Sequence, residues 1–182
     1  LKDNVKESIF NLIQHSSDIK INLLNSNILD CFSGCGSFGI ECLSRGSTMV
    51  DFVEDYQLSI SILEKNVNYF KLNDKSKIFK MSTENFFLKN LQNKKYDIIT
   101  ANLPYIPEDK KIKELNFEPY EALYAKDDGL HYIKMLIGIL PVIIKKNGIA
   151  LIEIDPNHTD YLNDLKNFKV SIFKDLNNLD RI

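Results

Sequence analysis

Apolar residues recur along this chain with two periods, one typical of amphipathic helices and the other of buried strands. Val5, Ile9, Leu12 and Ile13 recur at helical spacing, which predicts a helix over residues 3–16. Further helices are predicted over 38–44, 58–70, 84–91, 131–144 and 159–167. Short apolar runs predict strands over 28–32, 49–53, 78–81, 96–100, 149–154 and 169–173, with a turn at 146–148.

Strands that alternate with helices indicate an α/β fold with a mostly parallel, doubly wound sheet. We expect one catalytic domain over residues 1–182, in which 1–26 form an N-terminal helix and lead-in. Residues 103–130 are irregular and interrupted by Pro104, Pro107, Pro119 and Gly129. A loop of this length is usually functional, so we expect it to form the substrate side of the site.

Composition narrows the class of protein only slightly. The 182 residues are 44% hydrophobic and carry a formal net charge of -2, which gives no overall attraction to nucleic acid. Lysines cluster at 94–95, 110–113 and 145–146, and we interpret these clusters as solvated surface. The longest apolar stretch, 135–144, is too short to span a bilayer. The chain begins with Leu, so it can be a piece of a longer protein.

The three cysteines lie close together in sequence, at Cys31, Cys35 and Cys42. Their odd number argues against a disulfide framework and for a reducing, cytoplasmic location. A metal site would need a further ligand nearby, and the three histidines lie far away in sequence. We therefore expect neither a metal site nor association with a membrane.

A glycine-rich loop follows the first predicted strand. It reads Asp30-Cys31-Phe32-Ser33-Gly34-Cys35-Gly36, with Gly39 three residues later, and Glu54 ends the second strand. Glycines let a backbone approach a ligand closely, and a carboxylate at Glu54 can accept both hydroxyls of a ribose. We expect Phe32, Ser33, Gly34, Gly36 and Glu54 to bind an adenosine-containing cofactor. Taken alone, the loop fits S-adenosylmethionine, NAD or a purely structural turn.

Asn102, Leu103, Pro104 and Tyr105 follow the fourth predicted strand. The Asn102 oxygen and the carbonyls near Pro104 can accept N–H groups, and the ring of Tyr105 can stack on a flat group. This combination suits a planar amino group, such as a side-chain amide or a nucleobase amine. It favours S-adenosylmethionine over NAD, because hydride transfer needs no such grip. A plain proline turn is the alternative.

Two further positions are candidates for cofactor contacts. Ser82 and Thr83 follow the third strand, where such pockets usually hold adenine, although both residue types are also common in turns. Asp30 can orient the amino-acid end of the cofactor or hydrogen-bond to loop amides. We also expect Asn102 to contact the cofactor.

The second half of the chain resembles the HemK/PrmC family of methyltransferases, which modify the glutamine N5 of peptide-chain release factors. The matching segments are 102–107, 117–119, 122–123, 128–130, 146–148, 151–154, 174–176 and 180–181. The resemblance implies a Rossmann-like class I fold, S-adenosylmethionine as methyl donor and the glutamine of a Gly-Gly-Gln loop as acceptor. It implies that Asn102 and Tyr105 hold the glutamine, with Pro104 between them, and that Glu54 holds the donor's ribose.

The chain departs from that family at three points. Leu103 stands where the family usually has Pro, and only 27 residues precede the first strand, where the family carries a helical domain. Through residues 5–11, 30–36 and 43–46 the first half resembles the RsmD-type guanine-N2 methyltransferases of small-subunit ribosomal RNA, and Phe32 stands where release-factor enzymes usually place Gly. Ribosomal RNA is therefore the alternative substrate. An NAD-dependent oxidoreductase and a non-catalytic binding module remain as other classes.

Overall fold

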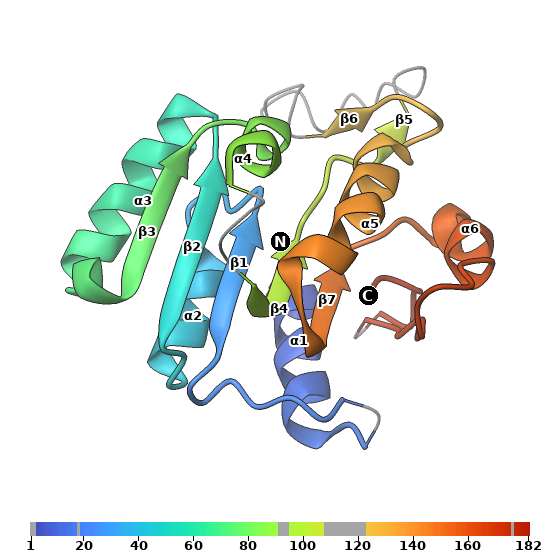
Figure 1. Ribbon diagram of the computed structural model, residues 1–182, viewed down its shortest axis with the longest axis horizontal. Helices are drawn as coiled ribbons and strands as arrows, with labels where there is room; N and C mark the ends of the chain where they lie inside the picture. The colour runs from blue at the N-terminus through green and yellow to red at the C-terminus, as the bar shows by residue number, and fades with distance from the viewer. Residues whose placement is uncertain (1–2, 18, 91–94, 108–122, 176) are drawn as a thin grey trace.

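The computed structural model describes residues 3–17, 19–90, 95–107, 123–175 and 177–182. Its centre is a five-stranded sheet in the order β3-β2-β1-β4-β7, in which all neighbouring strands are parallel (Figure 1). The strands are β1 Asn27–Cys31, β2 Met49–Glu54, β3 Ser76–Lys80, β4 Tyr96–Ala101 and β7 Ile144–Ile152. The strand order reverses direction between β1 and β4, and ligands of open α/β sheets bind beyond the strand ends at such a point.

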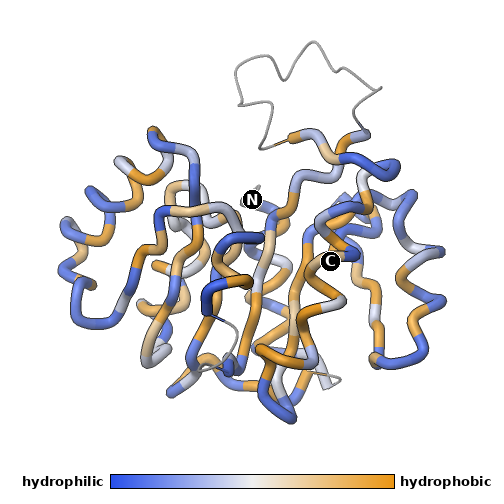
Figure 2. The backbone as a smooth tube through the Cα atoms, turned by 45° about the horizontal axis from the view of Figure 1, so that its top comes forward, coloured by the Kyte–Doolittle hydropathy of each residue, from blue (hydrophilic) through white to orange (hydrophobic). Residues whose placement is uncertain are grey.

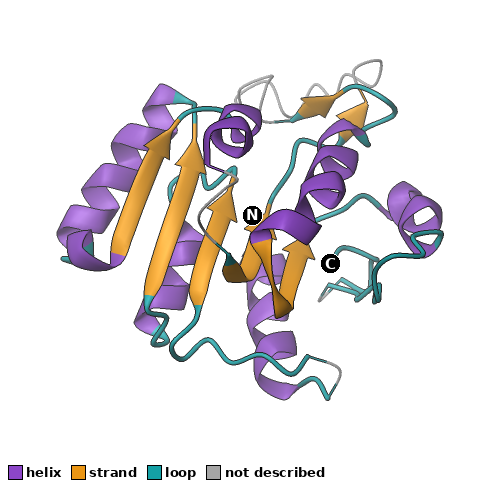
Figure 3. Ribbon diagram, in the orientation of Figure 1, coloured by secondary structure: helices purple, strands orange, loops and turns teal. Residues whose placement is uncertain are grey.

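Helices cover both faces of the sheet (Figure 3). One face packs against α1 Asp3–His15, α2 Ser37–Ser44 and α3 Gln57–Tyr69, with Phe52 of β2 among the fully buried side chains. The other face packs against α4 Thr83–Asn90 and α5 His131–Ile143, and Ile99 of β4 is fully buried there. Figure 2 shows hydrophobic segments running through the centre of the molecule. The doubly wound arrangement predicted from the sequence is confirmed.

The sixth predicted strand is wrong. Residues 169–173 contain no strand, and the chain instead folds back so that Phe173 exchanges backbone hydrogen bonds with Ile182. An isolated antiparallel bridge joins Lys174 to Asp180 next to that contact. The apolar side chains of this run are partly buried, because Val170 and Ile172 pack against the α4/α5 side of the core. The local apolar pattern thus indicated contact with the core but not the backbone partner of the segment.

Two predicted boundaries near the C-terminus are also wrong. The turn expected at 146–148 lies inside β7, where the pairing shifts from Tyr96–Ile144 to Ile98–Ile149. A Cβ on Gly148 would lie 2.8 Å from the Asp97 carbonyl oxygen, so glycine permits this irregularity. The helix expected over 159–167 is shorter, α6 Thr159–Asn163, and follows a 3-10 turn over Pro156–His158, called η4.

The carboxyl ends of the five strands lie along the upper edge of the sheet in Figure 1. Two short strands at this end, β5 Ile106–Pro107 and β6 Tyr124–Ala125, pair in parallel, so the two described ends of the 103–130 segment meet. The Ile106 N–H also donates to the Leu123 carbonyl at 2.9 Å. Residues 108–122 lie outside the described residues, as do 94 and 110–113 of the lysine clusters.

Candidate functional site

The pairing register of the sheet places the carboxyl ends of four strands at the same level. Cys31 of β1 pairs with Val53 of β2 and Ala101 of β4, and Ala101 pairs with Ile152 of β7. The residues that follow these positions are Phe32, Glu54, Asn102 and Glu153. The Glu153 N–H still donates to the Ala101 carbonyl at 3.1 Å, so the ladder extends to this level. The structure thus brings together residues of the predicted cofactor loop and of the predicted acceptor motif.

The glycine loop is a tight turn that returns the chain into α2. The Gly36 N–H donates to the Ser33 carbonyl at 2.8 Å, and Gly34 and Gly36 have left-handed φ of 55° and 78°. A Cβ on Gly36 would overlap Leu63, and one on Gly39 would lie 2.8 Å from atoms of Phe52 and Val50. A Cβ on Gly34 would meet no described residue within 4 Å. Gly36 and Gly39 are therefore required by packing, and Gly34 is the glycine that faces open space.

The Glu54 carboxylate is bound to the backbone around it. Its Oε2 accepts from the Gly34 N–H at 2.7 Å, and its Oε1 accepts from the N–H groups of Asp55 and Tyr56 at 3.0 and 2.9 Å. Glu54 thus connects the end of β2 to the glycine loop. A carboxylate offers about four lone-pair sites, so these three bonds leave it with acceptor capacity.

Asp30 is a buried carboxyl at the start of α2. Its Oδ2 accepts from the Gly39 N–H at 3.1 Å, so the structure shows it bonded to an amide of the first turn of that helix. Burial raises the pKa of Asp30 from 3.8 to about 7, although the Gly39 hydrogen bond lowers it in part. The structure shows the hydrogen bond to an amide, and orientation of the amino-acid end of the cofactor by Asp30 stays a prediction.

Phe32 adopts a left-handed backbone conformation, with φ of 53°. A non-glycine residue pays for this conformation in steric strain, which is the physical reason why glycine suits this position in similar loops. The half-buried Phe32 ring packs edge-to-face against Tyr132 of α5, with centroids 5.2 Å apart. This contact joins the cofactor loop to the helix on the other side of the switch point.

Ser82 caps α4. Its hydroxyl accepts from the Asn85 N–H at 3.3 Å, and the Phe86 N–H donates to its carbonyl at 2.9 Å. The Thr83 side chain beside it is buried. Helix capping is therefore sufficient to explain Ser82, and the contact of Ser82 and Thr83 with adenine stays a prediction.

The acceptor motif follows β4, with its two middle residues, Leu103 and Pro104, buried and its two outer residues, Asn102 and Tyr105, half-buried. Leu103 belongs to the α4/α5 side of the core, so packing of its side chain anchors the segment where the similar family has Pro. The Tyr105 hydroxyl donates to Glu153 Oε1 at 3.4 Å. Burial, followed by the nearby Glu153 carboxylate, raises the pKa of Tyr105 to about 12.

Two residues beside this motif carried no predicted role. Glu153 follows β7 and is buried, and His158 of η4 is buried against the 128–129 turn. Glu153 lies inside the strand predicted over 149–154, so the sequence did not place it at a strand end; in the structure β7 ends one residue before it. His158 gave no signal either, since its position depends on how the chain folds after β7.

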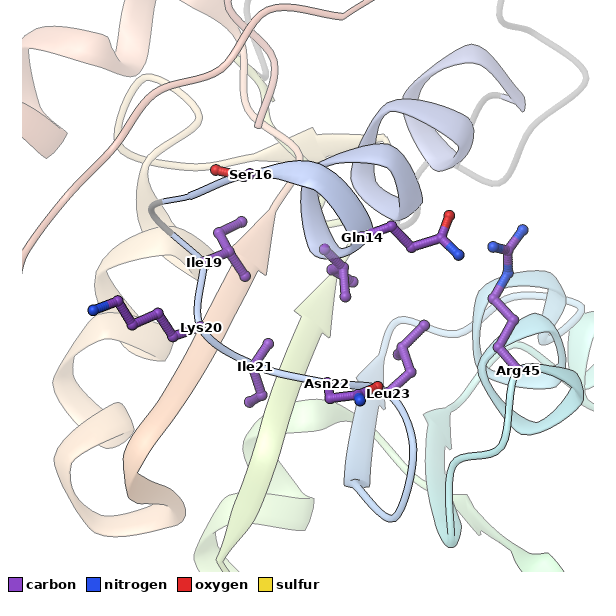
Figure 4. A pocket seen from close by; sticks show the side chains of 9 residues that line it. Gln14, Ser16, Ile19, Lys20, Ile21, Asn22, Leu23 and Arg45 are labelled. Carbon is purple, nitrogen blue, oxygen red and sulfur yellow. The ribbon is translucent and has the colours of Figure 1, made fainter.

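Two cavities lie away from this site. One, of about 470 Å³, is lined by the connection from α1 to β1 and by Arg45 after α2, at the amino ends of the strands (Figure 4). Asp97 and Lys145, which form an ion pair at 2.7 Å, line a neighbouring one. Both are at the edge opposite to the predicted site, and neither contains any of its residues.

None of the clusters of His, Cys, Asp and Glu among the described residues has the composition of a metal site. None of the helices that the structure describes is both long enough and apolar enough to cross a bilayer.

Curated proteins similar to this chain are methyltransferases by name. The ribosomal protein uL3 glutamine methyltransferase of Francisella tularensis is 29% identical over 136 residues, which are 71% of this chain and 41% of that protein. The release factor glutamine methyltransferase of Fusobacterium nucleatum is 29% identical over 190 residues, covering 94% of this chain and 50% of that protein. The chain therefore spans half or less of the length of these relatives.

Solved structures share the fold. The "putative methylase HI0767" from Haemophilus influenzae is 24% identical with a TM-score of 0.59, over 84% of this chain and 79% of that one. SMU.776, described as "a putative methyltransferase complexed with SAH", is 14% identical with a TM-score of 0.58, over 85% of this chain and 36% of that one. The Rossmann-like class I methyltransferase fold predicted from the sequence is confirmed.

A match to a protein family covers the larger part of the chain. The family described as "Conserved hypothetical protein 95" matches residues 1–134. This segment runs from α1 into α5 and contains both the glycine loop and the acceptor motif. The chain therefore belongs to the conserved hypothetical protein 95 family.

Proposed function

We propose that this chain is the catalytic domain of an S-adenosylmethionine-dependent N-methyltransferase that modifies the side-chain amide of a protein glutamine, in the Gly-Gly-Gln loop of a release factor. One observation carries the proposal. The glycine loop, Glu54 and the Asn102–Tyr105 motif leave neighbouring parallel strands at the point where the strand order reverses. The residues proposed to bind the methyl donor and those proposed to bind the acceptor therefore lie next to each other at the carboxyl edge of the sheet.

The cofactor is S-adenosylmethionine, and the residues present fit it. Gly34 combines a left-handed φ with open space beside its Cα, so a ligand can approach the loop backbone there. The remaining acceptor capacity of Glu54 suits a ribose hydroxyl, and a second hydroxyl can replace the Gly34 N–H. When bound, the cofactor supplies an electrophilic methyl group.

The acceptor side has to hold a weak nucleophile in place. An amide nitrogen reacts poorly because its lone pair is delocalised into the carbonyl. In the proposal, Asn102 and the carbonyl of Leu103 or Pro104 accept the N–H groups of the glutamine, and the Tyr105 ring stacks on its plane. Positioning of this kind contributes up to about 7–11 kcal/mol in favourable systems. The raised pKa of Tyr105 keeps its phenol protonated near neutrality, so Tyr105 acts by contact and not as a base.

The names of the relatives support a protein glutamine as substrate. Both the uL3 and the release factor enzymes are glutamine methyltransferases by name. The resemblance in the second half of the chain, which includes the acceptor motif, supports a release factor in particular. Such a substrate would place the protein in the cytoplasm.

A second candidate is methylation of a nucleobase amine in ribosomal RNA. The family match covers residues 1–134, and the first half of the chain is the part that resembles the RsmD-type guanine methyltransferases. A guanine N2 amine is also planar and offers two N–H donors, so the same motif could bind it. The chemistry of the motif fits both candidate functions, so the identity of the methylated substrate has to distinguish them.

Transfer of label from S-adenosylmethionine tests the proposal. The chain is incubated with labelled donor and with either a release factor or small ribosomal subunits. We expect label in the release factor glutamine and loss of transfer in Asn102→Ala, with affinity for S-adenosylhomocysteine retained. Asn147→Ala is the matched control, because Asn147 is exposed at the opposite edge of the sheet. Label only in the RNA would favour the second candidate.

Thermal shifts distinguish the other classes. Stabilisation by NADH and not by S-adenosylhomocysteine would indicate an oxidoreductase. Stabilisation by neither ligand would indicate a binding module. A loss of donor affinity in Asn102→Ala as large as the loss of transfer would mean that Asn102 supports the fold of the site instead of the acceptor.

A further inference from the structure

The segment after β7 runs beside the acceptor motif and touches it through Glu153. The Glu153 side chain is 3% exposed, and its Oε1 accepts from the Tyr105 hydroxyl at 3.4 Å. This segment is itself held from the C-terminus, since the Ile154 N–H donates to the Arg181 carbonyl at 2.9 Å and Arg181 Nη1 donates to the Ile154 carbonyl at 3.2 Å. The far end of the Tyr105 ring is thus held by a supported element.

His158 makes a second contact from the same segment. Its side chain is 3% exposed, and Nε2 lies 3.2 Å from the Asp128 carbonyl oxygen. A carbonyl can only accept, so Nε2 is the donor in this contact. The Nδ1 atom of the ring is buried without a hydrogen-bond partner among the residues that the structure describes, and the Nε2 contact with Asp128 holds the ring. Asp155 sets the position of His158, because the His158 N–H donates to its carbonyl at 2.9 Å.

Gly129 lies close to both the His158 ring and the backbone of Tyr105. It has a left-handed φ of 87°, and a Cβ there would overlap the Tyr105 carbonyl oxygen and lie 3.0 Å from His158 Nε2. The 128–129 turn is therefore packed between the imidazole and the acceptor motif. The Gly129 N–H donates locally, to the Lys126 carbonyl at 3.2 Å, so the contact with His158 links the turn to a distant segment.

We infer that Glu153 and His158 are positioning residues for the acceptor. Glu153 holds the hydroxyl end of Tyr105, and His158 holds its backbone through Asp128 and Gly129. Together they set the plane of the Tyr105 ring, on which the acceptor stacks. They do not act on the residues that are proposed to bind the methyl donor. This inference rests on the proposed function, because it assigns both residues to the acceptor half of that site.

The kinetic test compares two substitutions of His158. His158→Leu removes the donor to Asp128, whereas His158→Gln keeps an N–H donor near the position of Nε2. The loss of one buried neutral hydrogen bond corresponds to about a tenfold change at most. We expect His158→Leu to raise the acceptor KM by about tenfold, with kcat and the dissociation constant of S-adenosylhomocysteine within about twofold of wild type. His158→Gln is expected to restore most of the acceptor KM.

The same design applies to Glu153. In Glu153→Gln the amide oxygen can still accept from Tyr105, and in Glu153→Leu it cannot. We expect the Leu variant to raise the acceptor KM and the Gln variant to stay near wild type. Equal effects of Leu and Gln at both positions, or a loss of donor affinity parallel to the change in acceptor KM, would overturn the inference.

Hydrogen–deuterium exchange gives a readout that needs no transfer. We expect faster exchange at the amides of 129–131 in His158→Leu than in wild type, with His158→Gln in between and the melting temperature of all three alike. If exchange in His158→Leu is unchanged, the contact between His158 and Asp128 does not constrain the 128–129 turn, and the inference is refuted. If wild type transfers no label to any acceptor, the proposed function fails, and the exchange result still decides whether His158 fixes the turn.

Discussion

Substitution of Gly36 by Ala tests the claim that the glycine loop is built by packing and that only Gly34 is open to a ligand. Gly36 has a φ of 78°, and a Cβ at this position would overlap Leu63 Cδ1 and lie 3.3 Å from Phe52 Cε1. Leu63 and Phe52 are fully buried, so neither can move into solvent. The added methyl therefore causes both backbone strain and overpacking.

The two effects have known sizes. A left-handed conformation costs a non-glycine residue about 1–2 kcal/mol, and an extra methyl in a packed core about 1–3 kcal/mol. Loss of unfolded-state entropy returns about 0.4–1 kcal/mol. We therefore expect Gly36→Ala to lower the free energy of unfolding by about 1–4 kcal/mol. For a domain of this size each kcal/mol lowers the melting temperature by about 2–4 °C.

Gly34→Ala is the matched control. It has a φ of 55° but no atom of a described residue within 4 Å of an added Cβ, so only the strain applies. Thermal unfolding followed by circular dichroism gives the stability of each variant, and calorimetric titration gives the affinity for S-adenosylhomocysteine. We expect the larger loss of stability in Gly36→Ala, and in Gly34→Ala a loss of affinity that exceeds its loss of stability. A Gly34→Ala variant that is the less stable of the two, or that binds like wild type, would refute this reasoning.

Two further predictions concern buried polar groups. Asp30 binds a proton more tightly in the folded state, with a pKa of about 7 against 3.8, so its contribution to stability is complete below about pH 4 and is lost as the pH rises to about 7. Asp30→Asn keeps an oxygen for the Gly39 N–H and should flatten this part of the stability–pH curve measured by urea unfolding; an unchanged slope would contradict it. Tyr96 donates to the fully buried Asp51 at 2.7 Å, and Tyr96→Phe should therefore lower the free energy of unfolding by about 1–3 kcal/mol in urea, whereas a neutral effect would show that Asp51 replaces the lost partner.

The order of elements and the edge that holds the site could be predicted from the sequence. Five strands and their helices have strong local patterns, and alternation of the two implies parallel strands whose carboxyl ends meet. This pattern predicted Gly34, Glu54 and Asn102 at one edge. The resemblance to release-factor enzymes marked Phe32 as unusual, and its left-handed φ of 53° gives a physical basis for that difference.

The individual side-chain partners could not be predicted in this way. Glu54 binds three backbone N–H groups, Asp30 binds an amide of α2, and Ser82 caps α4. Each partner depends on distances of a few ångströms between segments that are remote in sequence. A pattern of residue types does not contain those distances.

The amino-acid sequence by itself determined the α/β class, the parallel sheet and the edge where the chemistry-bearing residues gather, because periodicity is a local property that each segment carries. Tertiary structure alone decided that 169–173 turns back onto the C-terminus and that β7 continues through 146–148. It also decided that Glu153 and His158 support Tyr105. These outcomes depend on which of several possible partners a segment meets, and that choice is made by packing over the whole chain.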